Sequence, residues 1–133
     1  MKNITLTDVS PMLKAKNLEE TIAFYTTVLG FTLGGRQENW CSLQWGDVCL
    51  MFFDGAELET AEPRMTGVLY FNPTDVKALW EAVKDKATIE WELQTMFYDM
   101  VEFAIRDCNG YTLSFGQDVS QVAPPLPPRL SED

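Results

Sequence analysis

Histidine, the side chain most often used for acid–base and metal chemistry near neutral pH, is absent from this chain of 133 residues. Without an imidazole there is no Ser-His-Asp or Cys-His nucleophile, no imidazole base and no His-ligated metal. Cys41, Cys49 and Cys108 lack C-x-x-C spacing and lie among apolar or strand-like residues, so we interpret them as reduced thiols rather than nucleophiles. Carboxylates, hydroxyls and aromatic rings remain to carry any function.

Glu102 is the one acid in a strand-like segment that alternates apolar residues with Glu102, Ala104 and Arg106. Two interpretations of this carboxylate stay open. It could form an internal ion pair with Arg106, with which it shares a strand face. Alternatively, it could serve as the counter-ion of a cationic ligand, or as a general base if the protein were an enzyme.

The charge balance restricts the partners. Ten Lys and Arg against twenty Asp and Glu give a net charge of −10, which would repel a nucleic-acid backbone or an anionic membrane. No apolar run approaches the ~20 residues of a membrane helix, and the first residues lack the apolar core of a signal peptide. We therefore expect a soluble, cytoplasmic protein of one domain whose partner is a cationic or neutral small molecule.

Hydrophobic periodicity predicts two helices, each opened by a side chain that can cap it. The first runs from Asn17 to Leu29 and ends at Gly30, and the second begins after Asp75 and carries Trp80 on its apolar stripe, which we interpret as core. Strands are predicted within residues 31–53, as three short strands punctuated by Gly34-Gly35 and Gly46-Asp47, and at 67–71, 88–93, 101–106 and 111–115, the last pair joined by a turn at 107–110.

The two halves of the chain repeat the same order of elements. Asn17 matches Asp75 at an offset of 58 residues, and Leu50 matches Leu113 at an offset of 63. Each half predicts a β-α-β-β-β unit whose single helix covers one face of its sheet, so two units should pack edge to edge around a cleft. We expect one α+β domain at residues 1–117, with units at about 8–53 and 67–117, and a Pro-rich tail at 118–133.

Two stretches resemble the vicinal-oxygen-chelate superfamily, which includes glyoxalase I, extradiol dioxygenases and bleomycin-resistance proteins. The first comprises Ser10-Pro11-Met12-Leu13, NLEETIAFY at 17–25 and VLGF at 28–31, and the second comprises Tyr98 with EFAIRDCNGYTLSFGQ at 102–117. In the second stretch Cys108 replaces the proline of the family's D-P-x-G turn. The resemblance implies a glyoxalase/bleomycin-resistance-like fold, in which two β-α-β-β-β units form a curved sheet around a cleft.

The resemblance also locates the positions at which enzymes of that superfamily hold a metal, usually with His and Glu. Here these positions carry Ser10, Met51, Val68 and Ser114, which are poor ligands for a divalent ion. We therefore expect no metal and no other cofactor. This departure favours the metal-free branch of the family, typified by bleomycin-resistance proteins, which bind a cationic drug without chemistry and are commonly homodimers with aromatic clefts.

Strand alternation, taken with the resemblance, predicts which side chains face the cleft. Most of them are apolar or aromatic, as expected of a pocket for a flat or amphipathic small molecule. The predicted ligand-binding residues are Ser10, Met12, Trp40, Met51, Phe53, Val68, Tyr70, Tyr98, Glu102 and Ser114. The same side chains could instead fill the space between the units, and the pattern does not decide on which face Trp91 lies.

The sequence thus favours a metal-free small-molecule-binding protein, a homodimer that sequesters a cationic or aromatic, antibiotic-like ligand, rather than an enzyme. One alternative is a lyase, isomerase or dioxygenase-like enzyme that uses Glu102 or an unusual metal site. Another is an interaction module whose cleft is filled. The tail carries a P-x-x-P-x-R pattern at 124–129, for which we favour an extended tail on the surface or on a dimer mate over an SH3-type ligand.

Overall fold

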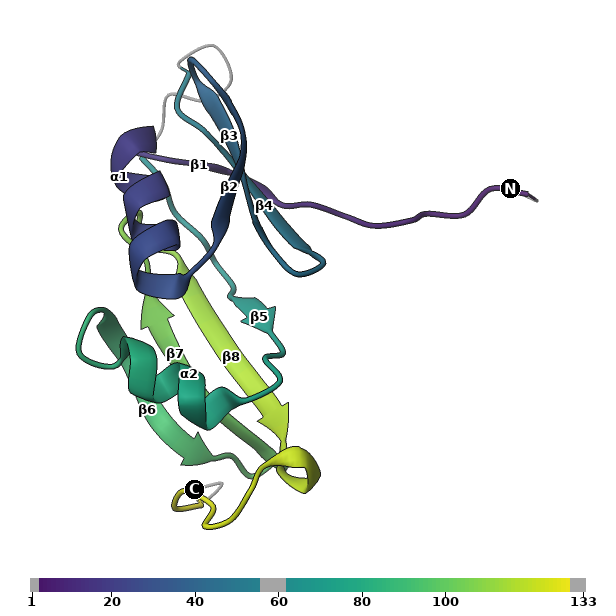
Figure 1. The fold of residues 1–133 in the computed structure, drawn as a ribbon, viewed down its shortest axis with the longest axis vertical. Coiled ribbons are helices and arrows are strands. Elements are labelled where there is room, and N and C mark those ends of the chain that lie inside the picture. The colour runs from purple at the N-terminus through teal and green to yellow at the C-terminus, as the bar shows by residue number, and fades with distance from the viewer. Residues whose placement is uncertain (1–2, 56–61, 130–133) are drawn as a thin grey trace. The chain divides into compact units, whose positions relative to one another are not determined.

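The computed structural model describes residues 3–55 and 62–129, and the chain divides into two compact units, Met1–Pro63 and Arg64–Asp133 (Figure 1). The first unit contains β1 (Met12–Lys14), α1 (Leu18–Ala23), the π-helical segment η1 (Phe24–Leu29), β2 (Thr32–Gln37), β3 (Trp40–Trp45) and β4 (Val48–Phe53). The second unit contains β5 (Leu69–Phe71), α2 (Val76–Val83), β6 (Thr88–Thr95), β7 (Met100–Arg106), β8 (Thr112–Asp118) and the 3-10 turn η2 (Val119–Gln121). Two four-stranded mixed sheets with few helices confirm the predicted α+β class. Within the described ranges, no helix is long and apolar enough to cross a bilayer.

The first helix begins at Asn17, whose side chain accepts a hydrogen bond from the Glu20 amide at 2.9 Å. Its second half, η1, has π-type hydrogen bonding and ends at Gly30, whose φ of +92° lies in the left-handed region. Tyr25 is fully buried and packs against Phe52 of β4, with ring centroids 5.1 Å apart. The predicted extent of this helix, its cap and its end are confirmed.

In the first unit the strands lie in the order β1-β4-β3-β2, with β1 parallel to β4 and the other pairs antiparallel. Paired residues point to the same side of a sheet, so one face is buried beneath α1 and η1, where Tyr25 meets Phe52. The opposite face, which we call the first open face, carries Met12, Trp40, Ser42, Met51 and Phe53.

The glycine pair Gly34-Gly35 lies inside β2, contrary to the prediction that it separates strands. The register between β2 and β3 shifts between Leu33 and Arg36, so the glycines occupy an irregularity in the ladder. A Cβ atom on Gly35 would lie 2.8 Å from the Trp40 ring. The glycine pair therefore allows the Trp40 indole to lie close to the backbone of β2. The turn between β2 and β3 is at residues 38–39 and not at the glycines.

The second unit repeats the arrangement of the first, with the strand order β5-β8-β7-β6 and β5 parallel to β8 (Figure 1). Tyr70 pairs with Ser114 just as Met12 pairs with Met51 in the first unit. Tyr70 follows Met12 by 58 residues and Ser114 follows Met51 by 63, so the two offsets found in the sequence are confirmed as structural equivalences. β6 and β8 run past their predicted ends. The predicted β-α-β-β-β order is present in both units.

Helix α2 covers one face of the second sheet. Asp75 caps it as predicted, its side chain accepting from the Ala78 amide at 3.0 Å. Trp80, predicted to be core, is partly buried and packs on Phe103 of β7, with ring centroids 5.2 Å apart. The predicted turn between β7 and β8 is also present, since Asp107 accepts hydrogen bonds from the backbone amides of Asn109 and Tyr111.

The Pro-rich tail lies along the second unit. Thr95, at the end of β6, donates its hydroxyl to the Pro127 carbonyl at 2.7 Å and forms an isolated bridge with Arg129. Lys77 of α2 donates to the carbonyls of Ala123 and Pro125 at 2.8 and 2.9 Å. The sequence predicts that the tail lies either on the surface or on a dimer mate, and these contacts place it on the surface of its own chain.

Candidate functional site

The second unit buries the carboxylate of Glu102, in β7, with 1% of the residue exposed. Four uncharged donors surround it. They are the hydroxyls of Tyr70 (2.9 Å) and Tyr98 (2.5 Å) at Oε1, and the indole N–H of Trp91 (3.1 Å) and the hydroxyl of Ser114 (3.4 Å) at Oε2. A carboxylate offers about four lone-pair sites, so these donors occupy its full accepting capacity.

Strand pairing brings these donors together. Tyr70 pairs with Ser114, and Ser114 pairs with Ala104, which lies two residues from Glu102 and therefore on the same sheet face. Trp91 of β6 also pairs with Ala104, and Tyr98 comes from the turn between β6 and β7. This face, opposite α2, is the second open face, and we call the following group the Glu102 cluster: Tyr70, Trp91, Tyr98, Glu102 and Ser114.

A glycine in β8 allows Tyr70 to reach the carboxylate. Gly116 pairs with Glu102, and a Cβ atom on Gly116 would lie 2.7 Å from Tyr70 Cζ and closer still to its hydroxyl. The phenol therefore lies directly over the backbone of β8, where no other residue would leave it room. Asn72 donates to the Gly116 carbonyl at 3.0 Å and fixes the chain that follows β5 to the same point.

The predicted ion pair between Glu102 and Arg106 is wrong. Arg106 forms an ion pair with Glu90 of β6 instead, and Glu102 has only the four uncharged donors as partners in the described part of the chain. The pairing between β6 and β7 shifts register between Ile89 and Trp91, and Glu90 lies within that irregularity. The buried carboxylate is thus solvated by dipoles and not by a cation.

The two phenols of the cluster are held in their protonated form. Burial, followed by the hydrogen bond to the Glu102 carboxylate, raises the pKa of Tyr70 and of Tyr98 above the usual value of a phenol. Each residue is nevertheless nearly half exposed, 44% for Tyr70 and 43% for Tyr98. The cluster therefore presents aromatic surface to solvent with a negative charge beneath it.

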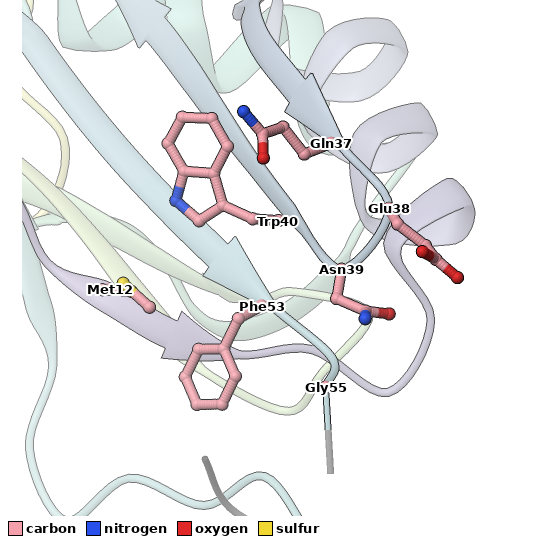
Figure 2. A pocket seen from close by; sticks show the side chains of 7 residues that line it. All are labelled: Met12, Gln37, Glu38, Asn39, Trp40, Phe53 and Gly55. Atoms are coloured by element: carbon pink, nitrogen blue, oxygen red, sulfur yellow. The ribbon is translucent and has the colours of Figure 1, made fainter. Parts of the chain in front are cut away.

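The first open face contains a hollow of about 300 Å³ at one end of its sheet (Figure 2). Its apolar part is formed by Met12, Trp40 and Phe53, whose side chains project from neighbouring strands in Figure 2. The remainder of the lining comes from the β2–β3 turn and the end of β4, namely Gln37, Glu38, Asn39 and Gly55. We call this site the Trp40 hollow.

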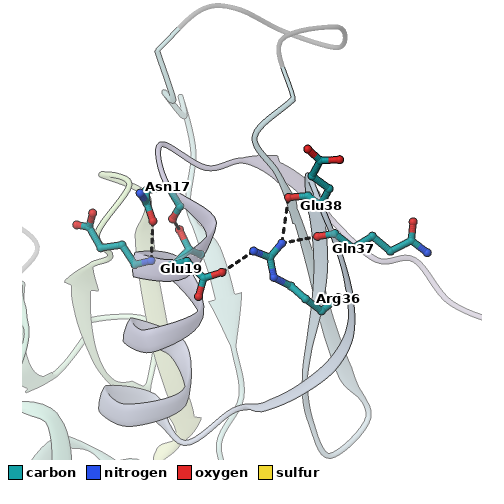
Figure 3. Close-up of polar contacts among 7 residues, drawn as sticks. Asn17, Glu19, Arg36, Gln37 and Glu38 are labelled. Atoms are coloured by element: carbon teal, nitrogen blue, oxygen red, sulfur yellow. Dashed lines mark hydrogen bonds and ion pairs between the residues drawn. The ribbon is translucent and has the colours of Figure 1, made fainter.

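Arg36 fastens the rim of the Trp40 hollow to α1 (Figure 3). Its guanidinium donates to Glu19 Oε1 at 2.5 Å and to the backbone carbonyls of Gln37 and Glu38. The ion pair with Glu19 is largely exposed and contributes less than about 1 kcal/mol to stability. Its effect is to hold the turn that rims the hollow.

Seven of the ten predicted ligand-binding residues belong to one of these two places. Met12, Trp40 and Phe53 line the Trp40 hollow, and Tyr70, Tyr98, Glu102 and Ser114 belong to the Glu102 cluster. Met51 lies on the first open face, where it pairs with Met12 and Ser42. Ser10 and Val68 precede β1 and β5 and belong to neither place.

Trp91 is the cluster member that the sequence could not assign. Strict alternation along β6 would place it on the same face as Ile89, which pairs with Ile105 on the α2 side of the sheet. The irregularity between Ile89 and Trp91 reverses this, and Trp91 pairs with Ala104 on the second open face. A bulge of this kind leaves no signal in the polar–apolar pattern.

The positions that the resemblance assigns to metal ligands do not fit a divalent ion. Met51 and Val68 offer neither a nitrogen nor an oxygen, and the Ser114 hydroxyl donates to Glu102. Ser10 alone would remain as a hydroxyl ligand. Across residues 3–55 and 62–129, no group of three or more Cys, Asp and Glu side chains could hold a metal ion.

Comparison with known protein families shows to which superfamily the chain belongs. The model of the Glyoxalase/Bleomycin resistance protein/Dioxygenase superfamily matches residues 9–115, which span both units. The chain belongs to this superfamily. Membership confirms the resemblance inferred from the two stretches of sequence described above. It leaves the activity open, because the superfamily includes both enzymes and resistance proteins, as its name states. A search of curated proteins found no match.

Solved structures with the same fold include both kinds of protein. A bleomycin resistance determinant encoded on the transposon Tn5 is 21% identical, with a TM-score of 0.70 over 85% of this chain and 98% of that one. The bleomycin-binding protein of Streptomyces verticillus, solved with copper(II)-bleomycin, is 19% identical, with a TM-score of 0.66 over 84% and 96%. Lactoylglutathione lyase from Agrobacterium tumefaciens is 18% identical, with a TM-score of 0.65 over 84% and 94%. These similarities show the fold.

Proposed function

We propose that this superfamily member is a metal-free small-molecule-binding protein that holds an aromatic, antibiotic-like ligand without transforming it. The observation that carries the proposal is the Trp40 hollow, in which an indole, a phenyl ring and a thioether form one wall. Two structural neighbours, the Tn5 resistance determinant and the Streptomyces protein, are described as bleomycin resistance or bleomycin-binding proteins. Their descriptions support a binding role for the same fold.

The hollow has the features of a site for a planar group. Its volume of about 300 Å³ equals the lower end of the range for small-molecule pockets. Gly35 lets the Trp40 ring lie close to β2, which fixes the plane of the indole against which an aromatic ligand would stack. The side-chain amides of Gln37 and Asn39 at the rim supply hydrogen-bonding groups that could orient such a ligand.

The geometry of Glu102 favours binding over the enzymatic alternative. All of its lone-pair sites receive hydrogen bonds, so it could abstract a proton from a substrate only after one of its four donors had left. A general base needs a free lone pair within about 3 Å of the proton that it removes. Sustained turnover of a bound compound by chelator-treated protein would overturn the binding assignment.

Thermal shift and calorimetry on chelator-treated protein test the hollow directly, with bleomycin and simple planar aromatic compounds as probes. Trp40→Leu should weaken binding several-fold, up to about tenfold, since stacking on an indole contributes about 0.5–1.5 kcal/mol beyond buried area. Trp45→Leu is the matched control, because Trp45 lies at the other end of β3 and outside the hollow. Equal affinity in both variants would contradict the proposal. The expected homodimer stays a prediction, which light scattering of the purified chain checks.

A further inference from the structure

We infer that the Glu102 cluster is a recognition site for a protonated amine, whose N–H groups donate to the phenol oxygens of Tyr70 and Tyr98. The inference rests on the proposed small-molecule-binding function and deepens it, because it adds a second place and a chemical class of ligand that the Trp40 hollow does not specify. It is carried by the direction of the hydrogen bonds, the charge beneath them and the exposed rings.

The hydrogen-bond directions make the cluster an acceptor surface. A phenol has one proton, and both Tyr70 and Tyr98 donate theirs inward to the same oxygen, Oε1 of Glu102. The lone pairs of the two phenol oxygens remain, and donation to a carboxylate makes those oxygens more electron-rich. A ligand that meets these oxygens can therefore only donate to them.

The charge beneath the phenols selects a cation. Glu102 is buried, and no Lys or Arg in residues 3–55 and 62–129 forms an ion pair with it. Three cations of this unit pair with other acids: Lys84 with Glu81, Arg106 with Glu90 and Arg129 with Asp99. A buried charge without a counter-ion is costly, so a cation on the phenol surface would relieve it.

The exposed rings supply the remaining contacts. Tyr70 and Tyr98 each expose more than two fifths of their surface, and Phe97, 54% exposed, lies with its ring centroid 5.1 Å from that of Tyr98. A cation within about 6 Å of such rings gains a further cation–π interaction. A primary ammonium has three N–H donors, enough to reach both phenol oxygens, whereas a quaternary ammonium has none.

Three probes of similar shape separate these contributions: benzylammonium, benzyltrimethylammonium and benzyl alcohol. NMR titration of ¹⁵N-labelled protein follows the indole N–H of Trp91, assigned with Trp91→Phe, since this group donates to Glu102. Benzylammonium should shift this signal and should bind at least about tenfold more tightly than benzyltrimethylammonium and benzyl alcohol. This difference in affinity is expected for charge-assisted hydrogen bonds that contribute about 1.5 kcal/mol or more. Equal affinity for the quaternary probe would overturn the role of the phenol oxygens.

Variants assign the preference to the cluster. Tyr98→Phe keeps the ring and removes one oxygen at a half-exposed position, so it should fold and lose most of the preference for benzylammonium. Glu102→Gln should lose it as well, and Trp40→Leu should keep it. If Trp40→Leu abolishes amine binding and Tyr98→Phe does not, the amine binds in the hollow, which overturns this inference and leaves the proposed function standing. If aromatic probes bind in the hollow and no amine binds anywhere, the inference alone fails.

Discussion

Replacing Gly116 by alanine should detach Tyr70 from Glu102 without straining β8. A Cβ atom at this position would lie 2.7 Å from Tyr70 Cζ and closer still to the hydroxyl, so the phenol must swing away. Gly116 is in regular antiparallel register with Glu102, a conformation that alanine adopts readily. The substitution therefore acts on a single side-chain hydrogen bond.

The magnitude follows from what the buried carboxylate loses. A hydrogen bond to a charged group contributes about 1.5–3 kcal/mol, and Glu102 would keep three of its four donors. Replacing glycine by alanine also stabilises the fold by about 0.4–1 kcal/mol through the unfolded chain. We expect a net loss of about 1–2 kcal/mol in the free energy of unfolding, measured by urea titration with an unchanged m-value.

Tyr70→Ala provides the background that refutes or supports this reasoning. The three heavy atoms nearest to the added methyl group all belong to Tyr70. Without that ring, Gly116→Ala should cost nothing or stabilise by up to about 1 kcal/mol. The same loss in both backgrounds would show that the methyl group disturbs β8 itself, and the proposed role of Gly116 would then be refuted.

Two further predictions concern the second unit. The raised pKa of Tyr70 and Tyr98 means that the native state holds their protons more tightly than the unfolded chain, whose phenols titrate near pH ~10. This contribution to stability is complete below about pH 10 and is lost progressively above it. Measured by urea titration, the free energy of unfolding should therefore fall more steeply above about pH 10 in the parent protein than in the double variant Tyr70→Phe/Tyr98→Phe. Parallel curves of this free energy against pH would contradict the prediction. Gln117, 8% exposed, accepts from the Val76 amide at 3.0 Å and donates to the Thr74 carbonyl at 2.7 Å. Gln117→Ala should therefore cost about 2–3 kcal/mol, and a loss below about 0.5 kcal/mol would show that water replaces the side-chain amide.

Local rules account for most of the fold because caps and alternation are encoded by residues close in sequence. Asn17 and Asp75 each accept from an amide three residues on, and this spacing can be found without any tertiary information. The period of two then places every second residue of a regular strand on one face. Together with the offset between the halves, it correctly places Tyr70 and Ser114 on one face.

The errors fall where a strand departs from its regular period. The Arg106–Glu90 pair, and the face of Trp91 that the sequence left open, both depend on the shifted register of β6, and no local pattern marks that shift. The role of Gly35 depends on the ring of Trp40, which lies on the neighbouring strand after the turn. A glycine pair in the sequence is compatible both with the end of a strand and with a close approach of a side chain to the backbone. These parts of the candidate site therefore could not be predicted from the sequence, because their geometry comes from irregularities in the strands.

The repeat explains how one backbone plan can present two different chemistries. Met12 and Met51 occupy the same paired positions in the first unit as Tyr70 and Ser114 occupy in the second. Thioethers can pack against rings but cannot donate a proton, so the first open face offers an apolar wall. Hydroxyls at the equivalent positions can donate, and they gather around the carboxylate of Glu102. Because the two sets of side chains share no member, substitutions that abolish stacking in the Trp40 hollow should leave amine recognition at the Glu102 cluster intact, and the converse should also hold.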